Sequence, residues 1–163
     1  MIKFYDVDEN YIDFLKQYDE QVPNIKYDAI NKFVCGIVLQ VNGIDYVAPI
    51  SHNTKVVKTS LPIYNKEKVI STIRFSFMFP ARHEHLTVKN FAAIAKTDPK
   101  YADLLQTEYK YCKSHEAEIL DKAKWVYKIG CNKNHYLNYT CCDFKKLENV
   151  YLNYERELLP STP

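Results

Sequence analysis

Residues 33–50 read FVCGIVLQVNGIDYVAPI, and this stretch decides the fold. Two apolar runs rich in β-branched residues flank the pair Asn42-Gly43. Asn-Gly readily adopts the two positive φ angles of a type I′ turn, whose twist matches that of the strands it joins. The sequence therefore predicts a β-hairpin with strands over 33–41 and 44–50.

Further elements are predicted on both sides of this hairpin. Asp8 is expected to cap a helix that ends before Pro23. Apolar and polar residues alternate over 69–79, which predicts another antiparallel strand that closes at Pro80.

The spacing of apolar residues becomes helical in the second half of the chain. Thr87 is expected to cap a helix over 88–96. Asp98-Pro99 is expected to open a long helix that ends at Gly130, because proline is tolerated at the first helical position. A last helix is expected over 143–159.

The order of these elements predicts the fold class. Strands fill the first half and helices the second, which is typical of an α+β protein, here with one domain over 1–163. The expected architecture is a compact, strongly bent antiparallel sheet surrounded by helices, with a helical C-terminal half.

The composition argues against a membrane protein and against a metalloprotein. The chain has no apolar run long enough to cross a bilayer and no basic-then-apolar N-terminus, so a soluble, cytoplasmic protein with no membrane partner is expected. Its five cysteines are odd in number, and their spacing, even combined with His135, matches no standard zinc motif. We therefore expect reduced thiols, no metal and no other cofactor.

The net charge of +2 is small, but the charged residues are unevenly spread. Acidic residues predominate over 1–28, whereas basic residues predominate over 51–74 and 124–146. The two basic segments are candidate surfaces for phosphate groups, and ordinary solvated faces are the alternative.

A polar turn, SHNTK at Ser51 to Lys55, follows the hairpin. RNA carries its own nucleophile in the 2′-OH, so a ribonuclease needs groups that deprotonate it, stabilise the charged phosphorane and protonate the departing 5′ oxygen. A hydroxyl, a histidine and a lysine can share those tasks. Serine, asparagine and threonine are also common turn formers, so an ordinary turn is the alternative.

Several short motifs occur in a fixed order around this turn: Lys3-Phe4-Tyr5, Tyr11 to Leu15, Val22-Pro23-Asn24, Lys32 followed by Gly36 to Leu39, and Tyr46 to Pro49. In order and spacing they resemble the ToxN/AbiQ family of type III toxin endoribonucleases. The likeness is specific in the first half of the chain and extends to the second half only in its helical character.

The resemblance implies a fold, a reaction and partners. The fold would be a MazF-like or Kid-like bent barrel. The reaction would be metal-independent cleavage of adenine-rich single-stranded RNA, with mRNA as substrate, to 2′,3′-cyclic phosphate and 5′-OH ends. The toxin would be inhibited by a small repeat-encoded pseudoknot RNA that it also processes, would form a closed protein–RNA ring, and would act in phage abortive infection.

The resemblance also assigns roles within the polar turn. The family's usual turn is Ala-Pro-Leu followed by Thr-Ser-Pro-Lys, and here the turn is one residue longer before the lysine. An ungapped match places Ser51 at the threonine and His52 at the catalytic serine, while a one-residue gap keeps Lys55 as the lysine. The predicted catalytic set has Ser51 orienting the 2′-OH, His52 as general acid or base, and Lys55 and Lys32 neutralising phosphate charge, together with Thr54.

Other residues are predicted to contact RNA. Tyr11 and Tyr27 would stack on or hold bases, with core packing as the alternative for Tyr11, and tyrosines near Lys133 and His135 would stack on unpaired bases in an antitoxin-binding groove. The full predicted RNA-binding set is Tyr11, Tyr27, Asn53, Lys58, Arg74, His83, His85, Lys128, Lys133 and His135.

Two rival functions need no catalytic turn. A non-catalytic RNA-binding module would use the same lysines and tyrosines, and a protein-binding adaptor would use the long helical stripe. Neither requires a hydroxyl, an imidazole and a cation together on one turn, so the turn separates the enzyme from both.

Overall fold

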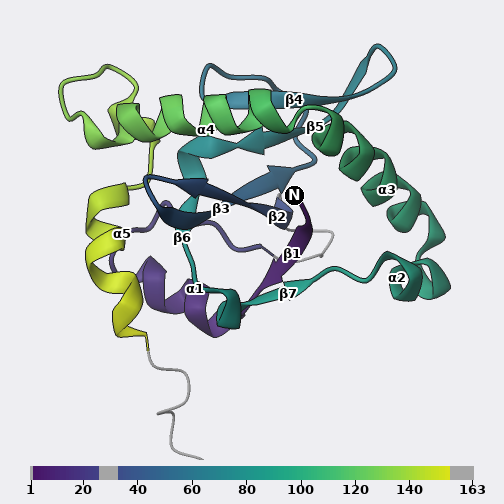
Figure 1. Ribbon diagram of the computed structural model, residues 1–163, viewed down its shortest axis with the longest axis horizontal. Helices are drawn as coiled ribbons and strands as arrows, with labels where there is room; N and C mark the ends of the chain where they lie inside the picture. Colours follow the sequence, from purple (N-terminus) through teal and green to yellow (C-terminus); the bar gives the residue numbers. More distant parts are fainter. Residues whose placement is uncertain (1, 26–32, 155–163) are drawn as a thin grey trace, which may run out of the picture.

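The computed structural model describes residues 2–25 and 33–154, in which helices pack around one layer of strands (Figure 1). Its strands are β1 (Phe4–Val7), β2 (Phe33–Val41), β3 (Ile44–Ser51), β4 (Ser60–Asn65), β5 (Lys68–Arg74), β6 (Phe79–Pro80) and β7 (Leu86–Val88). They form one antiparallel sheet in the order β4-β5-β3-β2-β1-β7, with β6 pairing to β3. Among the described strands β4 and β7 are the two ends and do not pair with each other, so the expected barrel is an open sheet.

The predicted hairpin is confirmed. Strands β2 and β3 pair from Val41↔Ile44 to Phe33↔Ser51, and the turn has φ angles of 54° at Asn42 and 74° at Gly43. The register brings the end of β3, at Ser51, beside the start of β2. The polar turn therefore leaves the sheet next to Phe33.

The predicted strand over 69–79 is wrong in its second half. Strand β5 ends at Arg74, and residues Phe75–Phe77 form a 3-10 helix, η1, before the short β6. The carbonyl of Ser76 accepts a hydrogen bond from the backbone N–H of Cys142, so the C-terminal half of the chain pairs here in place of a strand. Residues Phe79 and Pro80 then return to the sheet against β3.

The helices differ from the prediction at their boundaries. Asp8 caps α1 (Glu9–Lys16) through its side chain, as predicted. Thr87 caps nothing, because Leu86–Val88 pairs with β1, and the Asn90 side chain caps α2 (Phe91–Thr97) instead. The last helix, α5, covers Phe144–Val150 and continues only as the 3-10 turn η4 (Tyr151–Asn153); the predicted residues beyond 154 lie outside the described part of the chain.

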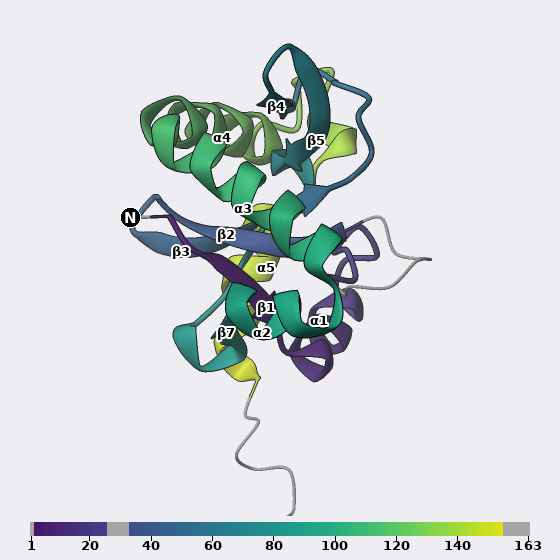
Figure 2. The same cartoon turned by 90° about the vertical axis from the view of Figure 1, so that its right-hand side faces the viewer.

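The predicted long helix is broken into α3 (Pro99–Ser114) and α4 (Glu116–Cys131). At the break, the imidazole Nδ1 of His115 lies 2.7 Å from the carbonyl oxygen of Tyr111, and the two rings stack. The imidazole thus contacts the carbonyl oxygen of Tyr111, which in a continuous helix would accept the backbone N–H of His115. The break lets α3 run past β4 while α4 packs across β2 and η1 (Figure 2).

One buried cluster joins the two halves of the chain. It contains residues from the sheet and from the helices. Among them are Tyr46 on β3, Tyr127 on α4 and Phe144 on α5, whose rings contact one another. Gly130 lies directly under the Phe144 ring, where an added Cβ would come within 2.2 Å of a ring carbon. The glycine therefore sets how closely α4 and α5 approach, in addition to lying near the end of α4.

Candidate active site

The polar turn is shaped by its own side chains. Ser51 is only 1% exposed, and its Oγ accepts the backbone N–H of Asn53 at 3.1 Å. The Asn53 carboxamide oxygen in turn accepts the N–H of Lys55 at 3.0 Å. These are the local turn-forming bonds expected of serine and asparagine. The buried Ser51 hydroxyl thus has a structural bond within the turn, and its predicted role in orienting a 2′-OH stays a prediction.

Strand β5 holds the turn from the outside. Thr72 donates its hydroxyl proton to the Asn53 carbonyl at 2.8 Å, and the Arg74 guanidinium donates to the Lys55 carbonyl at 2.6 Å and to the Thr72 hydroxyl at 2.9 Å. Arg74 is 9% exposed, and burial lowers its pKa. Two of its guanidinium N–H groups thus hold the turn, which gives Arg74 a structural role, and its predicted contact with RNA stays a prediction.

His52 stands apart from its neighbours in the turn because it has a partner from α3. Its Nε2 lies 3.3 Å from Oε1 of Glu108, a carboxylate with 0% exposure, while 33% of the His52 side chain is exposed. The Tyr101 ring, also on α3, meets the imidazole edge-to-face at 6.4 Å between centroids. The sequence prediction did not include Glu108. The feature of the sequence that could have identified Glu108 is its place on the apolar face of the predicted helix, between Leu105 and Cys112.

The end of the turn and the segment after it face solvent. Thr54, Lys55 and Lys58 are exposed, and the Lys58 ammonium donates to the Tyr136 hydroxyl at 2.8 Å and lies 5.2 Å from its ring centroid. Beside them is a mostly apolar cavity of about 510 Å³ whose lining includes Val56, Val57, Phe77 and Leu137. Exposed cations next to an apolar cavity suit a ligand with phosphates and flat bases.

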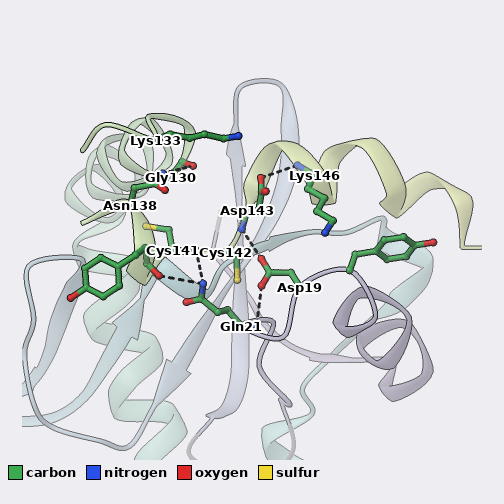
Figure 3. Close-up of a pocket in the computed structure, with 11 residues that line it drawn as sticks. Asp19, Gln21, Gly130, Lys133, Asn138, Cys141, Cys142, Asp143 and Lys146 are labelled. Atoms are coloured by element: carbon green, nitrogen blue, oxygen red, sulfur yellow. Dashed lines mark hydrogen bonds between the residues drawn. The ribbon is translucent and has the colours of Figure 1, made fainter. Parts of the chain in front are cut away.

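Figure 3 shows a second, polar pocket, which lies between the C-terminal end of α4 and the N-terminal end of α5. This cavity of about 340 Å³ has Lys133 and Lys146 in its lining, together with Tyr18 and Tyr139. Gln21 donates to the Cys141 carbonyl, and Asp19 accepts the backbone N–H of Asp143, which fixes the pocket floor. We call it the two-lysine pocket.

The remaining predicted RNA-binding residues are scattered. Lys128 is exposed on α4 outside the two-lysine pocket, and the His135 ring stacks on Tyr136. His83 is exposed and pairs with Asp45. Tyr27 and Lys32 lie outside the described residues.

Tyr11 and His85 are corrected by their burial. Tyr11 has 0% exposure, donates its hydroxyl proton to the Pro80 carbonyl, and stacks on the buried His85 ring at 4.1 Å between centroids. Burial also raises the Tyr11 pKa. Both rings belong to the core, which is the alternative that the sequence left open for Tyr11, and neither has a face for a base.

The cysteines are all free thiols, and burial raises the pKa of Cys112 to about 12, with the Glu108 charge as a smaller cause. Within residues 2–25 and 33–154, no three His, Cys, Asp or Glu side chains come together as metal ligands. No helix within the same residues has both the length and the apolar character needed to cross a bilayer.

Comparison with known proteins identifies the family. Residues 3–152 match the family of toxin ToxN from type III toxin–antitoxin systems. The chain belongs to the ToxN family. It is 28% identical to the endoribonuclease ToxN of Bacillus thuringiensis subsp. kurstaki over 94% of this chain and 84% of that protein. It is 25% identical to the endoribonuclease ToxN of Pectobacterium atrosepticum over 96% of this chain and 95% of that protein.

Solved structures agree with this assignment. One, from work on selective toxin inhibition by a non-coding RNA pseudoknot in type III systems, superposes with a TM-score of 0.84 at 25% identity, covering 95% of this chain and 98% of that one. The lactococcal anti-phage endoribonuclease AbiQ shares the fold, with a TM-score of 0.77 at 21% identity over 94% of this chain and 98% of that one. This chain is thus an endoribonuclease of the ToxN family.

The structural role of Arg74 in this ToxN-family fold leads to a test. We expect Arg74→Gln to lower the free energy of unfolding by about 1–3 kcal/mol, because it leaves the Lys55 carbonyl without its charged donor. Cleavage should slow by roughly 10-fold to 100-fold as the turn loosens. Urea denaturation and single-turnover cleavage measure the two effects.

The same variant separates support of the turn from RNA contact. Affinity for an uncleavable RNA should keep its dependence on salt, whereas Lys58→Gln, which removes an exposed cation near the turn, should flatten that dependence by about 0.7 in log–log slope. A flattened slope for Arg74→Gln would show that Arg74 contacts phosphate after all.

Proposed function

We propose that the Ser51–Lys55 turn is the catalytic site, and that this toxin cleaves unpaired, adenine-rich RNA without a metal cofactor. The observation that carries the proposal is the His52 imidazole, which is held by Glu108 on one side and is partly exposed in a turn that also presents Lys55. Family membership supplies the reaction class, and the turn supplies groups suited to it.

The reaction needs two proton transfers and one displacement. The 2′-OH loses its proton, the 2′ oxygen bonds to phosphorus, and the bond from phosphorus to the 5′ oxygen breaks. The departing oxygen gains a proton, which leaves a 2′,3′-cyclic phosphate and a 5′-OH. No water or external nucleophile is consumed in this step.

The proposal keeps the predicted tasks of His52 and the two lysines and gives Ser51 the task of holding the turn. His52 is the group for proton transfer, as general base or general acid, because its ring is the one partly exposed titratable group fixed within the described turn. Lys55, with Lys32 from outside the described residues, neutralises the phosphorane, since each carries a full charge and has hydrogen-bond donors. Ser51 and Asn53 hold the turn, and exposed Thr54 lies beside the substrate.

The adjoining cavity supports a single-stranded substrate. Val56 and Val57 present apolar side chains at its rim, next to Lys58 and Tyr136. Unpaired bases can leave the stack and enter such a cavity, whereas a duplex keeps them paired. A non-catalytic RNA-binding module would use these contacts equally well, but the endoribonuclease relatives and the fixed imidazole favour the enzyme.

We propose that the antitoxin is a small, repeat-encoded pseudoknot RNA that the toxin also processes, as fits a family with a structure concerned with inhibition by an RNA pseudoknot. The two-lysine pocket and the cavity beside the turn are lined from the same loop after α4, with Tyr139 in the first and Leu137 and Thr140 in the second, and the antitoxin RNA would bridge two copies of the protein through these sites. Bridging leads to a closed ring of alternating protein and RNA. The cell's mRNA would be the substrate in the cytoplasm, in defence against phage.

The first test concerns the reaction. We expect purified protein to cleave adenine-rich RNA in excess EDTA and to leave cyclic phosphate ends, because the proposed groups are all side chains. His52→Ala should lower the single-turnover rate by at least about 100-fold with RNA affinity nearly unchanged. Mass spectrometry of the products identifies the ends. Cleavage that stops on chelation and returns with magnesium would overturn the proposal, as would a fully active His52→Ala.

The second test concerns the antitoxin. We expect Lys133→Ala with Lys146→Ala to weaken binding of the antitoxin RNA. The slope of log affinity against log salt should become flatter by about 0.7 to 0.9 per lysine, because a phosphate that a lysine no longer contacts keeps its condensed counterion. Cleavage of a short substrate should survive. Lys128→Ala is the matched control, since Lys128 is exposed on α4 outside the pocket. Equal salt slopes for the double variant and the control would exclude this pocket.

A further inference from the structure

Glu108 is a buried acid in a place where the helix pattern expects an apolar residue. It lies on the face of α3 that also buries Leu105 and Cys112, and it has no solvent exposure. A buried carboxylate is destabilising unless its charge is paired and its oxygens accept hydrogen bonds. The fold therefore has to supply partners for both oxygens.

Those partners come from two other elements. The Ser71 hydroxyl on β5 donates to Oε2 at 2.8 Å, and Ser71 is itself fully buried. His52 Nε2 lies 3.3 Å from Oε1, and it is the one ion-pair partner of Glu108 within the described residues. The carboxylate thus joins α3, β5 and the polar turn at a point without water access.

This contact determines which nitrogen of His52 is available. A carboxylate accepts hydrogen bonds, so Nε2 carries the proton and the lone pair is on Nδ1. Nδ1 makes no hydrogen bond to any residue that the structure describes. The Nε2 edge faces a fully buried group, while 33% of the side chain as a whole is exposed. The Tyr101 ring limits rotation of the imidazole from the side.

We propose that Glu108 is a positioning residue for His52: it fixes the ring and its Nε2–H tautomer, so that Nδ1 exchanges protons with the RNA. This inference rests on the proposed role of His52 in catalysis. When Nδ1 takes a proton the ring becomes positive, and the adjacent carboxylate stabilises that charge. The logic is that of the carboxylate–histidine pair in serine proteases, reached here with the two ring nitrogens exchanged.

The direct test is the tautomer of His52, measured through its ring nitrogen chemical shifts by ¹⁵N NMR. In the unaltered protein we expect the proton on Nε2. Glu108→Gln keeps the size and the bond to Ser71, but its amide N–H can donate to Nε2. The ring should then move toward the Nδ1–H tautomer, and the single-turnover rate should fall about 100-fold or more with little change in KM. A neutral ring with its proton on Nδ1 in the unaltered protein would overturn the inference without any variant.

The controls separate this role from a structural one. Glu118→Gln removes an exposed carboxylate from α4 and should change neither the tautomer nor the rate. Glu108→Gln should add little to the loss already caused by His52→Ala, because Glu108 acts through that ring. A full additional loss would show that Glu108 acts independently of His52. If His52→Ala abolishes cleavage while Glu108→Gln is fully active, the positioning role fails and the proposed function stands; a fully active His52→Ala removes both.

Discussion

The pairing of β3 with β5 at Ile50 and Ser51 is the contact on which the site depends. It is only two residues long, yet it brings Thr72 and Arg74 against the carbonyls of the turn and Ser71 against Glu108. A turn of exposed polar residues has little rigidity of its own, because water competes for its hydrogen bonds. Here three polar residues of one strand, Ser71, Thr72 and Arg74, together with a carboxylate from α3, hold it in place.

This arrangement makes the position of the turn depend little on its own side chains. The frame that holds the turn is the β2–β3 hairpin, strand β5 and helix α3, and the chain as a whole superposes on solved structures at 25% identity or less. The frame contacts the turn largely through backbone carbonyls of Asn53 and Lys55, which do not depend on side-chain identity. Changes in the side chains of the turn can therefore be accommodated on this frame, and here Lys55 and Lys58 stay at the surface.

The sequence predicts the hairpin correctly because Asn42-Gly43 sets its geometry within a few residues. It fails at η1 and at His115, where bonds from the distant Cys142 and from a side chain to the Tyr111 carbonyl override a regular pattern. Site prediction follows the same division. The polar turn is visible as a motif, but the burial of Tyr11 and His85 and the inward direction of Arg74 are tertiary facts. Glu108 is 56 residues from His52, and no local pattern connects them.

A crystal structure with a substrate RNA that carries a 2′-deoxy sugar at the cleavage site would locate the catalytic site directly, because that RNA binds without reacting. We expect the scissile phosphate at the Ser51–Lys55 turn. There the sugar's C2′ should face His52 Nδ1 at a distance that leaves room for a hydrogen-bonded oxygen, and Lys55 should contact a phosphate oxygen, about 3 Å away. A scissile phosphate bound in the two-lysine pocket or beside His83, with the turn free of RNA, would contradict it.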